Sequence, residues 1–293
     1  MRQRLVRAGL TPSALPLGID VEKWLARAKT PWDAFPDTTG AKMDAETISV
    51  KKALSFANVS LITGAQVTGL NTGKNGRIAS LEYIQGKKRQ NLSPEIVVLA
   101  AGAVNSAALL LKSANEQYPD GLANSSDMVG RNFMNHNTSA LMALNPLWVN
   151  KAIYQKTLLL NDFYLRGGPG DLPLGNLQLL GKISGNILRA KSGLPSLVAN
   201  WLARHSFDWY AMSEDLPDPD SRVSVKNGEI ILDWKRSNQK AHLALVTKAK
   251  SVLRQAGFPI VLSQAFGRET PSHQCGTARF GHDPANSVLD IYC

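Results

Sequence analysis

The alternation of apolar and polar residues in the first third of the chain predicts a helix followed by a hairpin. Residues 41–57 carry apolar side chains at helical spacing, which predicts a helix. Residues 59–70 are rich in β-branched side chains and predict a strand with a bend at Gly64. The pair Asn75-Gly76 then separates two strand-like runs. Because both residue types tolerate a positive φ, this pair predicts a β-hairpin.

The stretch EIVVLAAGAVNSAALLLKSA predicts a strand that turns directly into a helix. Residues 96–100 form a continuous apolar run, as in a strand buried on both faces, and residues 104–113 have the composition of a helix. Ala101, Gly102 and Ala103 carry only methyl groups or hydrogen, so a ligand can approach their backbone closely. Free amides at a helix start favour an anionic ligand, and cofactors bind at the carboxyl ends of strands in α/β sheets. Tight strand–helix packing without a ligand explains the same residues equally well.

Residues 131–265 have a different texture, in which short strand candidates alternate with turn-rich segments. The candidates are SALMAL, LGNLQLLGKI, FDWYAMS, RVSV and EIILDWK. An Asn-Gly pair at 227–228 marks another hairpin, and a helix is predicted from Ser237 or Asn238 to Gly257. This part of the chain therefore predicts a mostly antiparallel sheet. The two textures divide the chain into a first domain over residues 1–130, a β-rich domain over 131–265, and a tail, 266–293, that returns to the first domain.

The composition is that of an ordinary globular protein, with 44% hydrophobic and 19% charged residues. No apolar run approaches the roughly 20 residues of a membrane helix. The basic N-terminus lacks the continuous apolar core of a signal peptide. The two cysteines, Cys275 and Cys293, cannot build a disulfide framework, so a reducing cytoplasm is the default compartment.

The formal net charge of +10 raises the question of nucleic-acid binding. The lysines and arginines are spread along the chain, however, and no helix-turn-helix, zinc-finger or RNA-recognition signature is found. The run Lys87-Lys88-Arg89 follows Gly86 and is typical of a solvated turn. We therefore expect no nucleic-acid partner.

The dinucleotide fingerprint G-x-G-x-x-G between a strand and a helix is absent from this sequence. The GGPG run at residues 167–170 does not replace it, because no predicted strand precedes it and no predicted helix follows it. If a dinucleotide binds, this sequence lacks the segment that usually holds the pyrophosphate.

The stretch MVGRNFMNHN places a polar group between two predicted elements. Gly130 is followed by Arg131, Asn132, Asn135 and His136. Residues of these types line a ligand or cap a loop. Arg131 is more typical of the second role, and Asn132 and His136 fit either.

His273 lies in the small-residue stretch SHQCGT, beside Gly276. An imidazole can accept a proton at neutral pH, as abstraction of an alcohol proton requires. A hydrogen-bonded surface histidine is the alternative. A metal site from His273, Cys275, His282 and Cys293 matches no zinc spacing, and a nucleophilic Cys275 lacks a separate activating base.

In chain order, these stretches resemble the glucose–methanol–choline (GMC) family of FAD-dependent oxidoreductases. NVSLITGAQVTGL resembles the strand whose valine, here Val67, lies beside the FAD adenine. IVVLAAGAVNSAALLLKSA resembles the second family signature, and VGRNFMNH resembles the G-R-N-x-x-x-H element. LNDFYL, PLGNLQLLGK and EDLPDPDSRVSV resemble the substrate domain of bacterial members. SHQCGTARFGHDPANSVLD resembles the H-x-x-G-T element with the active-site histidine, here His273.

The resemblance implies a mixed α/β fold, with a partial Rossmann-like FAD-binding domain and an inserted antiparallel substrate domain. The implied cofactor-binding residues are Val67, Ala101, Gly102, Ala103 and Asn132. In the implied reaction, His273 takes the hydroxyl proton of an alcohol or sugar while a hydride leaves the same carbon for flavin N5. The electron acceptor is left open between oxygen, a quinone and a cytochrome subunit, and no metal or membrane span is expected.

The sequence also departs from the family pattern. The G-x-G-x-x-G half and the segment after SVLD, which carries a second His or Asn, are missing, and residues 32–42 keep Asp33, Phe35 and Pro36 of a family loop without its cysteines. We therefore expect a fragment cut at both ends, with weak or no FAD retention, no activity when isolated, and marginal stability or association. The alternative is a non-catalytic remnant that does not hold FAD.

Overall fold

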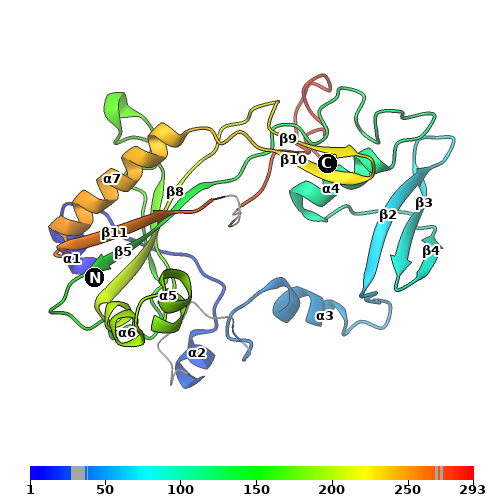
Figure 1. Ribbon diagram of the computed structural model, residues 1–293. Helices are drawn as coiled ribbons and strands as arrows, with labels where there is room; N and C mark the ends of the chain where they lie inside the picture. Colours follow the sequence, from blue (N-terminus) through cyan, green and yellow to red (C-terminus); the bar gives the residue numbers. More distant parts are fainter. Residues whose placement is uncertain (28–36, 38, 268–269, 271–272) are drawn as a thin grey trace. The chain divides into compact units, whose positions relative to one another are not determined.

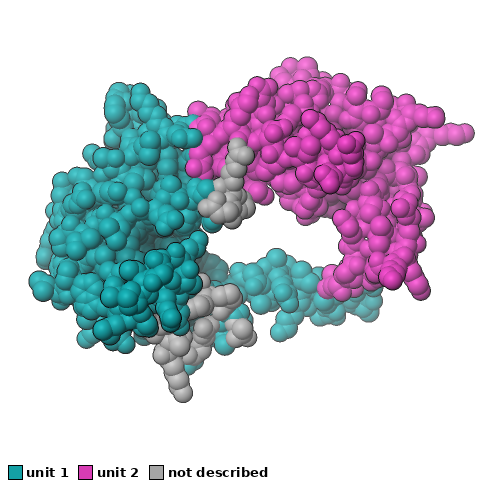
Figure 2. All heavy atoms as spheres, in the orientation of Figure 1, with its two compact units in different colours: residues 1–60, 137–214, 238–270 teal, residues 61–136, 215–237, 271–293 magenta. Residues whose placement is uncertain are grey.

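The computed structural model describes residues 1–27, 37, 39–267, 270 and 273–293 (Figure 1). Within these limits the chain forms two compact units, drawn in teal and magenta in Figure 2. Unit 1 comprises residues 1–60, 137–214 and 238–270, and unit 2 comprises residues 61–136, 215–237 and 271–293. The family loop with Asp33, Phe35 and Pro36 lies outside the described residues.

Unit 1 is built on a six-stranded sheet in the order β1-β6-β7-β8-β5-β11. The strands are β1 (Ser13–Ala14), β5 (Asn137–Leu144), β6 (Leu158–Leu160), β7 (Asn176–Leu179), β8 (Ser206–Ser213) and β11 (Ile260–Ala265). Every neighbouring pair is antiparallel, and β5 and β8 pair along their full length from Asn137↔Ser213 to Leu144↔Ser206. The predicted antiparallel sheet is confirmed, and β1, β6 and β11 are strands that the sequence pattern did not reveal.

Helix α7 (Gln239–Gln255) packs against this sheet and closes the core of unit 1. Its buried residues include Ala241, Leu245 and Ala249, which recur every four residues and form one apolar stripe. This stripe packs with Trp209 and Phe258 in the main hydrophobic core. The predicted helix of residues 237–257 is thereby confirmed.

The remaining helices of unit 1 are short. They are α1 (Arg2–Arg7), α2 (Val21–Arg27), α3 (Lys51–Ala53), α5 (Gly185–Ser192) and α6 (Ser196–His205), with a π-helix at Glu46–Val50 and a 3₁₀ turn at Pro169–Asp171. The helix predicted over residues 41–57 is therefore confined to its central part. Its apolar residues Met43 and Leu54 are 46% and 44% exposed, so their helical spacing does not mark a buried face.

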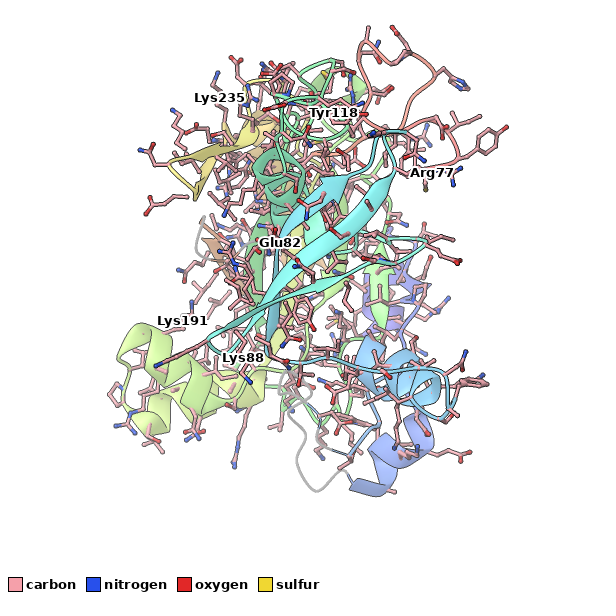
Figure 3. The ribbon with its side chains drawn as sticks, turned by 90° about the vertical axis from the view of Figure 1, so that its right-hand side faces the viewer. Arg77, Glu82, Lys88, Tyr118, Lys191 and Lys235 are labelled. Atoms are coloured by element: carbon pink, nitrogen blue, oxygen red, sulfur yellow. The ribbon has the colours of Figure 1, made fainter. Side chains whose placement is uncertain are left out.

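Unit 2 contains two antiparallel sheets and one longer helix. The elements are β2 (Ala65–Thr72), β3 (Ile78–Gln85), β4 (Lys88–Leu92), β9 (Arg222–Lys226), β10 (Glu229–Asp233) and α4 (Gly102–Lys112). Figure 3 shows the β2-β3-β4 sheet, with Arg77 near one end and Lys88 near the other. Both predicted hairpins and the helix after Ala103 are confirmed.

The two Asn-Gly turns differ in backbone conformation. Asn227 and Gly228 both have positive φ, 52° and 80°, as a two-residue hairpin turn requires. At the other hairpin, between β2 and β3, only Gly76 has a positive φ, because the turn is longer and Gly73 N donates to Arg77 O at 2.8 Å. The basic run after Gly86 belongs partly to β4, since Arg89 pairs with Ile84.

One predicted strand of unit 2 is absent from the described structure and another is shorter than predicted. Residues 96–100 join no sheet, and Ile96 and Val98 are 81% and 83% exposed. The prediction of a strand buried on both faces is wrong here, because such burial needs a neighbouring strand on each side. Likewise β2 begins only after the bend at Gly64, where φ is 63°, and Leu61 before it is 58% exposed.

The compact units divide the chain differently from the predicted domains. Residues 1–60 belong to unit 1, because Leu5 and Leu10 join its core and β1 pairs with β6. Residues 215–237 belong to unit 2, where β9 contacts α4 (Figure 1). Hairpin and helix contacts, rather than the change of texture at residue 131, set these limits.

Candidate functional site

Three segments that lie far apart in the sequence meet in unit 2. They are residues 101–103 at the start of α4, residues 130–136, and residues 273–277; we call them the three-segment site. Thr277 Oγ1 donates to Ala103 O at 2.7 Å, and Gly130 N donates to Thr277 O at 2.8 Å. The stretches AAGA, GRNFMNH and HQCGT therefore form one hydrogen-bonded cluster.

Glycines allow the backbones of these segments to approach closely. Gly276 has a φ of 98°, and a Cβ built on it would lie 1.9 Å from Asn132 O. Gly130 has a φ of 84°, and a Cβ there would lie 2.2 Å from Val223 O. No other residue type fits either position without moving the neighbouring main chain.

The start of α4 is fixed by packing of the rest of the helix. Ala107 and Ala108 are buried with Val129, Phe133 and Trp234 in the second hydrophobic core. Ala107 is fully buried, so its small side chain fits the close packing here. The helix start is therefore held rigidly beside residues 130–136.

The buried carboxylate of Asp215 helps to hold residues 130–136 in place. Asp215 is 6% exposed and accepts hydrogen bonds from Trp234 Nε1 at 2.7 Å and from Ser237 N at 2.9 Å. It also accepts from the backbone N–H of Asn135 at 3.3 Å. Asp215 thus anchors the residue next to His136. Sequence reasoning missed it, since the stretch EDLPDPDS indicated only a turn.

The imidazoles of His136 and His273 contact each other. Their Nδ1 atoms are 2.7 Å apart, and the rings meet edge to face with centroids 4.7 Å apart. His273 is exposed and His136 is half-buried. The sequence motif indicated a chemical role for His273 and left the role of His136 open. The structure places the two side chains in contact.

Two residues of the three-segment site have a left-handed backbone conformation. Asn132 and His273 have φ values of 57° and 59°, a region that non-glycine residues rarely adopt. Each such conformation costs on the order of 1 kcal/mol and persists only where the surrounding structure imposes it. Six other non-glycine residues of the described chain also have a positive φ, so this conformation alone does not distinguish the segment pair.

Asn132 and Gly102 have the properties expected of cofactor contacts. Asn132 is 3% exposed, and its Nδ2 has no hydrogen-bond partner within the described structure. Gly102 is exposed with a φ of 78°, and a Cβ built on it meets no atom within 4 Å. The site therefore offers a buried amide donor, open space beside a helix start, and the free amides of α4, all suited to a polar, anionic cofactor.

Val67 also lies in unit 2. Within the described residues, no hydrogen bond joins it to the three-segment site. It lies in β2 and is 40% exposed. Strand β2 contacts α4 near the far end of the helix, where Leu70 N donates to Ser113 Oγ at 2.9 Å. Of the six predicted site residues, the structure thus brings five together.

Cys275 does not have the environment of a nucleophile. Burial, and to a lesser extent the charge of Asp215, raise the pKa of its thiol above the ordinary value. The thiol therefore stays protonated at neutral pH, whereas the thiolate is the reactive form. Among residues the structure describes, no group of three or more His, Cys, Asp or Glu side chains is placed to hold a metal ion. Within the same part of the chain, no helix has the length and apolar character needed to span a membrane.

Relatives in sequence and in structure point to one family. Residues 27–138 match the family model described as GMC oxidoreductase. The chain is 26% identical to the fructose dehydrogenase large subunit of Gluconobacter japonicus, over 78% of this chain and 46% of that protein. It is 27% identical to paromamine 6'-oxidase of Streptomyces fradiae, over 86% of this chain and 48% of that protein.

A solved structure has a similar fold. It is pyridoxine 4-oxidase from Mesorbium loti, with a TM-score of 0.57, 18% identity and coverage of 87% of this chain and 54% of that chain. The mixed α/β fold class is thereby confirmed. The chain spans about half the length of the curated relatives it matches. Residues 27–138 thus match the GMC oxidoreductase family model, and most of the chain is similar in sequence to these relatives.

Proposed function

We propose that this chain is part of an FAD-dependent oxidoreductase that oxidises a CH–OH group of a small alcohol or sugar, with His273 as the base. The observation that carries the proposal is the position of His273 within the three-segment site, hydrogen-bonded to His136 and joined through Thr277 to the start of α4. The relatives' names support the substrate class, because they are dehydrogenases or oxidases of fructose, paromamine and a propanediol.

FAD, when bound, supplies the acceptor for the hydride that leaves the alcohol carbon. The protein itself must remove the proton of the alcohol hydroxyl group. A ring nitrogen of His273 takes the hydroxyl proton, so that the O–H bond breaks as an N–H bond forms and the alcohol becomes a carbonyl. His273 suits this task because it is exposed, while the backbone of Cys275, two residues further on, is hydrogen-bonded to Met134.

The cofactor residues proposed are Val67, Ala101, Gly102, Ala103 and Asn132. Support comes from the unpaired Nδ2 of Asn132 and the open space at Gly102. We assign the cofactor and base to unit 2, and the substrate-domain role to the six-stranded antiparallel sheet of unit 1. Because the relatives include both oxidases and dehydrogenases, the acceptor of the reoxidation step stays open between oxygen, a quinone and a cytochrome subunit.

The test is donor-dependent bleaching of FAD supplied in excess to the purified chain without oxygen. We expect the chain to be inactive as isolated, because it retains FAD weakly, and to bleach added FAD slowly with at least one alcohol or sugar donor. His273→Ala should slow bleaching by about 10²-fold or more, as for removal of a general base. Bleaching at the same rate in wild type and His273→Ala would contradict the proposal.

A second function, a folded chain that does not bind FAD, is favoured by the exposure of Ile96 and Val98. These residues lie directly before the proposed cofactor contacts and join no sheet in the described structure. A chain that shows no saturable FAD binding at any concentration would support this second candidate.

A further inference from the structure

The contact between His136 and His273 restricts where each ring carries its proton. A neutral imidazole has one N–H donor and one nitrogen acceptor. Two nitrogens 2.7 Å apart must share a single proton, so one Nδ1 donates and the other accepts. The pair therefore has two arrangements, which differ in the nitrogen of His273 that remains free.

Only one arrangement leaves His273 able to act as a base through Nε2. If the Nδ1–H of His273 donates to His136, the neutral His273 ring has an unprotonated Nε2. If His136 donates instead, the neutral His273 ring carries its proton on Nε2 and cannot accept another there. Whether His273 can act as a base through Nε2 therefore depends on which of the two rings donates the shared Nδ1 proton.

The contact between His136 and His273 is fixed by hydrogen bonds of the neighbouring backbone. Met134 N donates to Cys275 O at 2.9 Å, and Cys275 N donates to Met134 O at 3.1 Å, as an antiparallel bridge. In an antiparallel pair, the residue two positions after one bridge partner lies opposite the residue two positions before the other. His136 and His273 hold these positions, and Asp215 anchors the neighbouring Asn135.

We propose that His136 is the positioning residue of the base: its Nδ1 accepts the Nδ1 proton of His273 and so holds His273 in the tautomer with a free Nε2. This inference rests on the proposed function. The alcohol proton then passes to Nε2 of His273, and the imidazolium that forms keeps its hydrogen bond to His136. FAD, when bound, would supply the acceptor for the hydride from the same carbon, so that two electrons and both hydrogens are accounted for.

The first test uses no activity. The chain has five histidines, so ¹⁵N-histidine labelling gives few signals, and single substitutions assign them. At a pH where His273 is neutral, we expect its Nδ1 to be protonated and its Nε2 unprotonated. His136→Ala should abolish this preference, His136→Asn should keep it because the amide oxygen accepts in the same place, and His282→Ala is the matched control.

A protonated Nε2 on neutral His273 in the wild type overturns the inference, and so does an unchanged tautomer in a folded His136→Ala variant. If His136→Ala fails to fold, His136→Phe takes its place, because it keeps the ring and removes the acceptor.

The second test separates this inference from the proposed function. With FAD in excess, we expect His136→Ala to lower the bleaching rate at saturating donor about tenfold with little change in the half-saturating donor concentration, and His136→Asn to restore most of it. An equal loss in His136→Ala and His136→Asn contradicts the positioning role. An unchanged rate in His273→Ala contradicts the proposed function itself, while the tautomer measurement still decides the proton position.

Discussion

At the scale of single residues, Gly276 is where the three-segment site is most tightly constrained. Its backbone approaches Asn132 O so closely that a Cβ would lie 1.9 Å away. Its φ of 98° adds a conformational penalty for any other residue. The H-x-x-G-T motif therefore depends on glycine for a steric reason that is visible only when the opposing strand is in place.

Gly276→Ala should lower the free energy of unfolding by about 2–4 kcal/mol, because strain and a main-chain clash add together. Gly86→Ala is the matched control: Gly86 also has a positive φ, 62°, but a Cβ there meets nothing within 4 Å, so only about 1 kcal/mol is expected. Urea unfolding followed by tryptophan fluorescence measures both. Equal losses in the two variants would show that the close approach to Asn132 does not exist.

Cys275 provides a prediction about pH. Its pKa is raised by burial and by Asp215, so the folded chain holds the thiol proton more tightly than the unfolded chain does. As pH rises, the unfolded state therefore loses this proton first, and the contribution of Cys275 to stability is lost in the alkaline range. In a Cys293→Ser background, iodoacetamide should label Cys275 more slowly in the folded chain than in urea. Faster labelling in the folded chain would contradict the assigned environment.

At the scale of elements, local patterns predicted the structure wherever a segment's partners are near it in the sequence. The turns at Gly76 and at Asn227-Gly228, and the helix that becomes α7, were found because turn residues and apolar spacing specify them directly. Residues 96–100 were misread because burial of a strand depends on neighbours that the run itself cannot reveal.

The same reasoning explains what could be foreseen of the site. The motif around His273 indicated a proton acceptor. Its contact with His136, across 137 residues of sequence, follows from the register of the Met134–Cys275 bridge, which no local pattern encodes. Asp215 was missed because its role depends on three donors that only the folded chain brings together.

The bond from Thr277 Oγ1 to Ala103 O ties residues 273–277 to α4 and can be tested directly. Thr277 is 2% exposed, so Thr277→Val removes the hydrogen bond of a buried hydroxyl to the Ala103 carbonyl and should cost about 1–2 kcal/mol. Hydrogen exchange should accelerate in the first turn of α4 and stay unchanged in α7. Thr277→Ser retains the hydroxyl and should behave as wild type; acceleration in both variants would attribute the effect to packing instead.

At the scale of the whole molecule, the chain exposes large apolar side chains next to the proposed cofactor contacts. Ile96 and Val98 are more than four-fifths exposed in a segment that joins no sheet in the described structure. Exposed apolar segments with unpaired backbone groups favour association with other chains. We therefore expect the purified chain to associate at high concentration.

The double substitution Ile96→Lys and Val98→Lys should reduce association, measured by sedimentation at several concentrations, without lowering thermal stability. Leu147→Lys, at an isolated residue of unit 1 that is 88% exposed, serves as control and should leave association unchanged. If the double variant associates as strongly as the wild type, residues other than Ile96 and Val98 mediate the association.

Equilibrium titration with FAD, followed by flavin fluorescence, tests the central claim most directly. We predict weak but saturable binding that is lost on gel filtration, and an affinity about tenfold lower in Asn132→Gly, which removes one hydrogen-bond donor to the cofactor. Glycine suits the φ of 57° at this position, so the variant loses the amide without added strain. Asn58→Leu, at an exposed residue of unit 1, is the control. Absence of saturable binding, or equal affinity in wild type and Asn132→Gly, would contradict the account.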